Sequence, residues 1–232
     1  MIYVTGDMHG DESRLYDAEW RKLKKDDILI VCGDFGFLWD GSKHEQEALK
    51  FLGTRKFTVL FLDGTHENFD LLSKCRESFW KGGYVRRVHG NLLNLKRGQI
   101  YNIDGKRIFT FGGGESADRD IRLETGGFFP QQLPSPAEFK EGAQNLDEAE
   151  LKVDYILTHE PPQLIRSAME LRRGGEQKVS GLGGFLQEVA NTCEYEHWYF
   201  GSMHEDRKLT PKFSCVFNKI IPLESNGEDL EK

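Results

Sequence analysis

The stretch Met1–Gly10, MIYVTGDMHG, decides the fold of this chain and supplies its first two chemically useful side chains. The apolar run Ile2–Val4 predicts a strand, and the two glycines that follow it permit a sharp turn. Such a turn points Asp7 and His9 at one spot just past the carboxyl end of the strand. A carboxylate beside an imidazole is a ligand pair that suits a borderline divalent cation such as Zn, Mn or Fe(II).

The same arrangement recurs after four further apolar runs, each of which ends in an acidic residue or a histidine. They are Ile28–Cys32 before Gly33-Asp34, Phe57–Leu62 before Asp63-Gly64-Thr65-His66-Glu67, Val153–Leu157 before Thr158-His159-Glu160, and Trp198–Phe200 before Gly201-Ser202-Met203-His204. Ligands of open α/β sheets bind outside the carboxyl ends of the strands. The sequence therefore predicts that these side chains meet in one pocket and bind a metal there.

The spacing of apolar residues predicts an α/β fold. Residues 1–75 alternate strand-like runs with amphipathic segments, which indicates right-handed βαβ crossovers and a parallel sheet. The expected helices in this part are Asp11–Lys24, His44–Leu52 and Asn68–Cys75. Short runs then predict a meander that forms a second sheet, with a hairpin at Asp104-Gly105. The runs of this meander are Tyr84–Val88, Leu92–Leu95, Gln99–Ile103 and Arg107–Phe111.

Residues 112–136 are polar and rich in glycine and proline, which predicts a long loop that acts as a flap over the site. Its arginines, Arg119 and Arg122, either bind a substrate phosphate or solvate the flap. Helices and strands alternate again from residue 137, with the expected helices Ala137–Leu151, Gln163–Leu171 and Phe185–Thr192 and a mobile, glycine-rich segment over 174–184. We expect a single domain over residues 1–223 and a frayed acidic tail over 224–232.

The composition argues against several classes of protein, including nucleic-acid binders, disulfide-stabilised proteins and membrane-spanning proteins. The 232 residues carry a net charge of −7, which argues against a general nucleic-acid binder. Arg86, Arg87, Lys96 and Arg97 form either a local basic groove or solvated strand edges. The four cysteines lack any C-x-x-C pair and read as free, packed thiols. No leader precedes Ile2 and no apolar run approaches 18 residues, so we expect no membrane span and a cytoplasmic location.

Taken in order, the motifs of this chain resemble those of the calcineurin-like metallophosphoesterases from Met1 to about Leu223. The motifs are Asp7-x-His9, Gly33-Asp34, Gly64-Thr65-His66-Glu67, His159 and Gly201-Ser202-x-His204. The resemblance implies a four-layer α/β/β/α sandwich, with the metals at the carboxyl ends of the strands. It also implies hydrolysis of a phosphodiester or nucleotide-type substrate by a metal-bound hydroxide, with Mn, Fe, Zn or Ni as the divalent cations.

The resemblance also implies a role for each site residue. Asp7, His9 and His204 would hold the first metal, Asp34 would bridge to the second, and His159 would be a ligand of the second. His66 would be the catalytic histidine, which protonates the departing oxygen or stabilises charge on the phosphoryl group. Two cations about 3.5–4 Å apart clamp the attacking and leaving sides of that group.

Two departures from the family pattern fall on the second metal. Thr65 stands where the family has asparagine, and Ser202 stands where it has histidine. A hydroxyl is a poor neutral ligand beside an amide oxygen or an imidazole nitrogen. We therefore expect one tight metal site and one weak site.

The favoured function is a cytoplasmic metal-dependent phosphoesterase that acts on a small phosphoester or nucleotide, with nucleic acid not favoured as a substrate. The runner-up is a regulatory protein that binds a metal and a phosphorylated ligand with little or no turnover. A third interpretation is a nuclease, which would bind single-stranded nucleic acid in a salt-dependent way.

Overall fold

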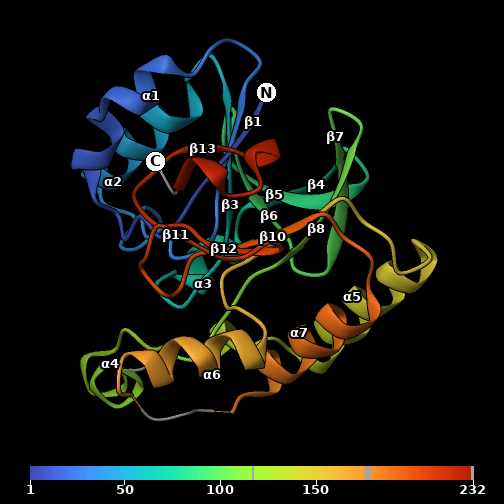
Figure 1. Cartoon of the computed structure of the whole chain (residues 1–232). Helices are drawn as coiled ribbons and strands as arrows, with labels where there is room; N and C mark the ends of the chain where they lie inside the picture. Colours follow the sequence, from blue (N-terminus) through green and yellow to red (C-terminus); the bar gives the residue numbers. More distant parts are fainter. Residues whose placement is uncertain (117, 176–178, 231–232) are drawn as a thin grey trace.

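The computed structural model describes residues 1–116, 118–175 and 179–230. Two β-sheets face each other at the centre of the molecule (Figure 1). The strand order of the first sheet is β13-β1-β2-β3-β6-β5-β4. Its strands are β1 Ile2–Thr5, β2 Ile28–Val31, β3 Thr58–Leu62, β4 Arg76–Trp80, β5 Gly83–His89, β6 Leu92–Leu95 and β13 Ile221–Pro222. The pairs β1–β2 and β2–β3 are parallel, which confirms the parallel sheet predicted for residues 1–75, and β3–β6 is parallel as well.

The second sheet has the strand order β11-β12-β10-β9-β8-β7. Its strands are β7 Gln99–Ile103, β8 Lys106–Phe111, β9 Tyr155–Thr158, β10 His197–Phe200, β11 Arg207–Thr210 and β12 Phe213–Cys215. The pairs β8–β9, β9–β10 and β10–β12 are parallel. The strands that precede the predicted site residues therefore lie in the parallel parts of both sheets.

The helices of the described residues are α1 Ala18–Lys22, α2 Lys43–Gly53, α3 Phe69–Ser73, α4 Arg119–Thr125, α5 Pro136–Glu148, α6 Gln163–Arg172 and α7 Gly181–Thr192. Helices cover the outer face of each sheet, whereas α4 lies away from both sheets (Figure 1). Helices α1 and α2 lie on the side of the first sheet, and α5 and α7 lie on the side of the second (Figure 1). Helix α5 begins where the sequence favours it, because Ser135 and Glu138 form a capping box and Pro136 occupies the first turn.

Alternating side chains along the strands build three apolar cores, one between each pair of adjacent layers. In β2, Ile28 and Ile30 join the core between the sheets, whereas Leu29 and Val31 join the core under α1 and α2. In β10, Trp198 faces α5 and α7. Because these strands are covered on both faces, their sequences are continuously apolar. The predicted four-layer α/β/β/α sandwich is confirmed.

The middle of the chain differs from the prediction in its pairing. The runs at residues 84–88 and 92–95, which form β5 and β6, belong to the first sheet and not to the second. Strand β6 pairs in parallel with β3, and β5 pairs antiparallel with β6. The hairpin at Asp104-Gly105 is confirmed, and it joins β7 to β8 in the second sheet. Strand β4, which the sequence analysis missed, forms an edge of the first sheet.

Three other segments correct the prediction. The expected helix over residues 11–24 is divided into the 3-10 helix Glu12–Tyr16 and α1, because Asp17 between them has an extended backbone. The expected loop over residues 112–136 contains α4 and the 3-10 turn Pro130–Gln132. In the glycine-rich segment, residues 176–178 lie outside the described residues, and α7 begins at Gly181.

The acidic tail packs against the protein. It contains the 3-10 turns Leu223–Ser225 and Glu228–Leu230, and the side chains of Leu223 and Leu230 belong to the core between the sheets. The expectation of a frayed end is therefore wrong for residues 224–230, whereas 231–232 lie outside the described residues. The assignment of residues 1–223 to a single domain stays a prediction.

The structure bears on the state of the cysteines and on the expected absence of a membrane span. Cys32, Cys75, Cys193 and Cys215 are all free thiols, and all but Cys75 are buried. Across the described ranges, no helix combines the length and the apolar character needed to cross a lipid bilayer.

Candidate metal centre

The predicted site residues come together at the carboxyl ends of five strands. Asp7 and His9 follow β1, Asp34 follows β2, His66 follows β3, His159 follows β9 and His204 follows β10. Their possible ligand atoms form three overlapping groups, and within each group all of these atoms lie within 4.8 Å of one another. The groups are Asp7–His9–His204, His9–Asp34–His66 and Asp7–Asp34–His159. The structure therefore brings all six residues together, while their individual roles stay predictions.

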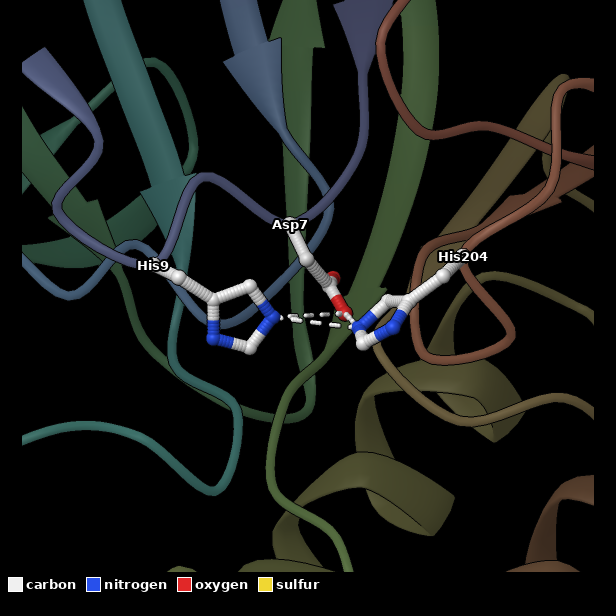
Figure 2. A group of neighbouring side chains, drawn as sticks. All are labelled: Asp7, His9 and His204. Carbon is white, nitrogen blue, oxygen red and sulfur yellow. Dashed lines mark hydrogen bonds and ion pairs between the residues drawn. The ribbon is translucent and has the colours of Figure 1, made fainter.

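The first group consists of Asp7, His9 and His204 (Figure 2). The Nε2 atoms of the two histidines are 3.1 Å apart, and Nε2 of His204 is 3.0 Å from Oδ2 of Asp7. Asp7 is 1% exposed, yet neither of its carboxylate oxygens has a hydrogen-bond partner with good geometry. An unsatisfied buried carboxylate is costly. A cation among these three side chains would remove that cost, so the donor set fits a metal.

The pKa values of the two imidazoles of the first group shift in opposite directions. Burial lowers the pKa of His9, against the opposing charges of Asp34 and Asp7. The hydrogen bond with Asp7 raises the pKa of His204 despite partial burial. Because a metal ligand must give up its proton, Asp7 opposes this step at His204 until a cation takes its place.

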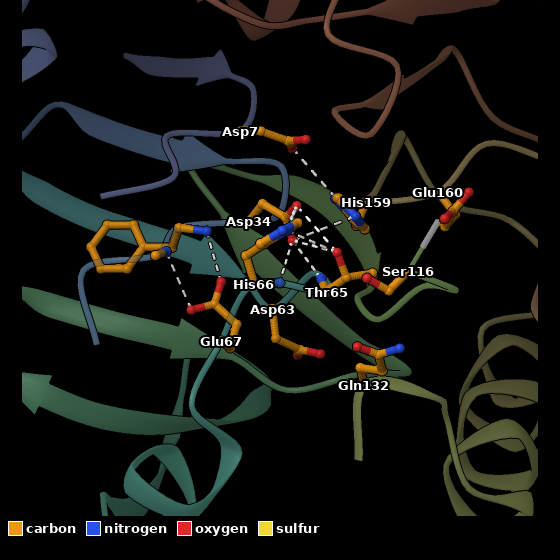
Figure 3. Close-up of polar contacts among 12 residues, drawn as sticks. Asp7, Asp34, Asp63, Thr65, His66, Glu67, Ser116, Gln132, His159 and Glu160 are labelled. Carbon is orange, nitrogen blue, oxygen red and sulfur yellow. Dashed lines mark hydrogen bonds and ion pairs between the residues drawn. The ribbon is translucent and has the colours of Figure 1, made fainter. Parts of the chain in front are cut away.

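The second group is centred on Asp34 (Figure 3). Oδ2 of Asp34 lies 2.7 Å from Nδ1 of His66, and Oδ1 lies 3.7 Å from Nε2 of His159. Oδ1 also accepts hydrogen bonds from the backbone N–H groups of His66, at 2.8 Å, and of Thr65. Burial raises the pKa of Asp34. The charges of His159 and His66 and the hydrogen bonds from His66 lower the pKa by more than burial raises it, so the group stays a carboxylate.

His159 is the most enclosed imidazole of the centre, with 2% exposure. Burial lowers its pKa, but the charges of Asp34 and Asp7 overcome that effect and raise the pKa to about 10. Its Nδ1 is 3.4 Å from Oδ1 of Asp7. His159 therefore pairs with both carboxylates, at the place where a cation would bind between them.

The two departures from the family pattern lie beside Asp34 and His159. The Thr65 hydroxyl is 3.3 Å from Oδ2 of Asp34 and 3.0 Å from Nδ1 of His66, so it already has partners. The Ser202 hydroxyl is buried without a hydrogen-bond partner, and the backbone N–H of Ser202 donates to the carbonyl of His159 at 3.0 Å. The serine side chain is too short to replace an imidazole.

The backbone of the centre is held in an uncommon conformation. His9, Asp34 and His204 have φ values of 50°, 34° and 51°, which lie in the left-handed region that non-glycine residues rarely adopt. Such residues persist only where the surrounding structure fixes them, and they cluster at functional sites. Gly64 is required nearby, because a Cβ at this position would lie 2.0 Å from Oδ1 of Asp34.

The glutamates that follow the motif histidines brace the loops of the centre. Glu67 is buried and accepts hydrogen bonds from the backbone N–H groups of Phe35 and Gly36, just after Asp34. Burial and the charge of Asp34 raise the pKa of Glu67. Glu160, which follows His159, is bound by an arginine of α6.

Helix α6 braces both halves of the centre, which the sequence did not predict. Nη1 of Arg166 lies 2.8 Å from Oε2 of Glu160. At the other end of the helix, Arg172 and Arg173 each lie 2.6 Å from a carboxylate oxygen of Glu205, the residue after His204. The sequence gives no signal for Arg172 and Arg173, because their partner Glu205 is more than 30 residues away. Arg166 is close to Glu160 in the sequence, but no motif indicates that the two side chains pair.

Arg14 is a second brace that the sequence analysis missed. Its guanidinium donates to the backbone carbonyls of Asp7 and Phe217, the latter at 2.7 Å, and to the Thr5 hydroxyl at 3.0 Å. The Phe217 ring in turn stacks on the His204 imidazole, with 5.0 Å between ring centroids. Arg14 therefore ties the loop after β1 to the segment that supports His204.

Asp40 and the three remaining histidines lie outside the three ligand groups. Asp40 accepts a hydrogen bond from the backbone N–H of Ser42, so it caps a loop. His197 is buried, with its ring nitrogens next to the Pro211 carbonyl and the Ser214 hydroxyl. His44 is exposed and His89 is exposed as well.

The predicted surface arginines are partly internal. Arg97 is 5% exposed, so it does not lie on a solvated strand edge. It lines a cavity with Arg86, and its charge there is offset by Asp63 and Glu138. Arg122 is 6% exposed, and its Nε donates to the Gly127 carbonyl at 3.0 Å. It therefore does not solvate a flap, whereas Arg119 is exposed.

Comparison with known proteins agrees with this geometry. The family model described as calcineurin-like phosphoesterase matches residues 1–205, a span that contains every residue of the three ligand groups. A search among curated proteins gives no match.

Proposed function

Because the chain belongs to the calcineurin-like phosphoesterases, we propose that it hydrolyses small phosphodiesters or nucleotide-type substrates with the help of divalent cations. The observation that supports this most is the position of Asp34, whose carboxylate belongs to two of the three ligand groups. A carboxylate can bridge two cations and offset part of their charge. The net charge of −7 favours small substrates over nucleic acid.

The proposal assigns the ligand residues to two cations. Asp7, His9 and His204 hold the first cation, Asp34 is shared, and His159 holds the second. Mn, Fe, Zn and Ni all suit this mixture of imidazole and carboxylate. When bound, such cations stabilise charge on the phosphoryl group and bring water to a usable pKa.

His66 is the proposed catalytic residue. Its Nδ1 lies 2.7 Å from Asp34, which fixes the ring, and its side chain is 37% exposed and so is open to a substrate. Its Nε2 faces outward, 4.0 Å from Oδ2 of Asp118. A protonated His66 donates from Nδ1 to Asp34 and holds its Nε2 proton for the departing oxygen.

The second cation binds weakly in this proposal. Its group offers Asp34 and His159, while Thr65 and Ser202 offer hydroxyls in place of better ligands. Changing only an outer partner of a metal ligand costs roughly 10–100-fold in affinity or activity, so two missing ligands should cost more.

The free cysteines fit a reducing compartment, and the cytoplasm is the proposed location.

Hydrolysis of bis-p-nitrophenyl phosphate with Mn or Ni tests the proposal, with Asp34→Asn as the inactive control. We expect metal-dependent release of p-nitrophenolate by the wild-type protein and none above background by the variant. Tight metal binding without turnover of any phosphoester would contradict an enzymatic role. It would favour instead a regulatory protein whose second metal site is impaired by Thr65 and Ser202.

A further inference from the structure

A cavity of about 280 Å³ lies between residues 115–116 and 119–133 on one side and helix α6 on the other. Two of its lining residues connect it to the metal centre. The Ser116 hydroxyl donates to Asp118, whose Oδ2 lies 4.0 Å from Nε2 of His66, and Arg166 pairs with Glu160, the residue after His159. Figure 3 draws two of its lining residues, Ser116 and Gln132, on the Thr65 side of the centre rather than the Asp7 side. A substrate held at the centre can therefore extend into this cavity.

The lining of the cavity combines an aromatic face with unused hydrogen-bonding atoms. The guanidinium carbon of Arg119 is 5.4 Å from the centroid of the half-buried Phe128 ring. Gln132 is 1% exposed, and its Oε1 is buried without a hydrogen-bond partner. Nε of Arg166 is likewise buried and unpartnered, although Nη1 binds Glu160. Buried polar atoms usually have partners, so these two point to an absent ligand.

The charges of the lining exclude one obvious ligand class. Arg119 and Arg166 are balanced by Glu115 and Asp120, and Arg166 is already paired with Glu160. A second phosphate would find little excess positive charge here. A neutral group that presents both donors and acceptors fits better, because a glutamine amide offers both and reads the edge of a base in that way. Planar bases also stack on aromatic rings and on guanidinium planes.

We propose that this cavity receives a neutral planar heterocycle of the substrate, such as a nucleobase, which stacks on Phe128 while Gln132 and Arg166 bind its edge. The volume is just below the usual range for ligand pockets, so it suits one ring system rather than a whole nucleotide. This inference rests on the proposed function and narrows its substrate class to nucleoside phosphoesters.

The test compares esters that share one leaving group. The 5′-p-nitrophenyl phosphates of thymidine and adenosine offer a base, and methyl p-nitrophenyl phosphate does not. We expect the wild-type kcat/KM for at least one nucleoside ester to exceed that for the methyl ester by about 10-fold or more, the scale of base stacking on an aromatic ring. Phe128→Leu, which keeps an apolar side chain but removes the aromatic face, should bring that ratio close to one.

Two matched variants control the test. Phe79→Leu removes an exposed phenylalanine on β4, outside the cavity, and should preserve the preference. Gln132→Glu keeps the side-chain shape but removes the amide donor, so it should lower the preference, whereas Gln131→Glu at the exposed neighbour should not.

Hydrolysis of the methyl ester with no preference for either nucleoside ester would overturn the inference but leave the proposed function intact. An equal ratio in wild type and Phe128→Leu would do the same. If the wild-type protein hydrolyses none of the esters, the proposed function fails. Calorimetric binding of thymidine and adenosine 5′-monophosphates then decides the matter, since equal affinities in wild type and Phe128→Leu would overturn the cavity assignment.

Discussion

The two halves of the metal centre use similar residues in very different settings. In the first half, His9 and His204 are partly exposed, with side-chain exposures of 33% and 48%, and their Nε2 atoms face each other. In the second half, Asp34 and His159 are buried and form an ion pair. In the first half a cation competes with the pair of His204 and Asp7 near the surface. In the second half it competes with the enclosed pair of His159 and Asp34, and it meets two hydroxyls where better ligands would help.

This contrast teaches that an enclosed set of ligands is not by itself a tight metal site. Burial holds His159 between two carboxylates, and that same pairing competes with a cation. Affinity depends on the balance between the new bonds and the ion pair that is lost. The proposal therefore assigns the tighter binding to the more exposed half.

The largest effect is expected at the residue that the halves share. Asp34→Asn keeps the shape of the side chain but removes the charge that offsets the cations. We expect metal-dependent hydrolysis of bis-p-nitrophenyl phosphate to fall by more than about 100-fold, beyond the range for an outer partner of a ligand. Asp40→Asn is the control, since this carboxylate caps a loop. Retention of a tenth of the wild-type activity in Asp34→Asn would break the assignment of Asp34 as the shared ligand.

The next effect separates catalysis from metal binding. His66→Gln removes the group that donates a proton, so turnover should fall by roughly 10²–10⁴-fold. Metal titrations of this variant should stay close to wild type, because His66 is not needed for either cation in the proposal. The exposed His44→Gln is a matched control. A loss of metal binding that parallels the loss of turnover would assign His66 to the ligands instead.

A gain of function sharpens the contrast between the halves. Thr65→Asn combined with Ser202→His supplies an amide oxygen and an imidazole to the second half. The affinity for the second cation should rise by about 10–100-fold, and phosphodiester turnover should rise with it. Calorimetry and steady-state kinetics measure the two effects on the same preparation. No gain in either quantity would count against the interpretation of these two positions.

The smallest effects are expected from the arginines of α6. Arg173 donates to the carbonyl of Met203 and to Glu205, so Arg173→Met should weaken the first cation by about 10-fold. Arg166 binds Glu160, so Arg166→Met should weaken the second cation instead. Metal titrations of the two variants check this division. Equal effects of both variants on both cations would show that α6 braces the centre as one unit.

The sequence predicted the fold and the site where an apolar run is directly followed by polar residues that can bind a metal. Continuous apolar runs such as Ile28–Val31 predicted buried parallel strands, and the polar residues just after them predicted the centre. Strand β4 was missed because its side chains are mostly exposed at a sheet edge. The pairing of β6 with β3 joins residues more than 30 positions apart, which no local pattern reveals.

The same limit applies to the supporting residues of the site. Asp7, His9, Asp34, His66, His159 and His204 were predicted because each stands next to a strand end. Arg14 and Arg173 look like ordinary surface arginines in the sequence, and only the folded chain brings them to backbone carbonyls of the ligand loops. Helix α4 was missed because glycines and prolines surround it.

Calorimetric titration of the metal-free protein with Mn²⁺ tests the central claim most directly. The account predicts one tight site with a stoichiometry near one, and a second site that binds at least about 100-fold more weakly unless substrate is present. Two sites of equal, high affinity would contradict it, because Thr65 and Ser202 would then cost the second cation nothing.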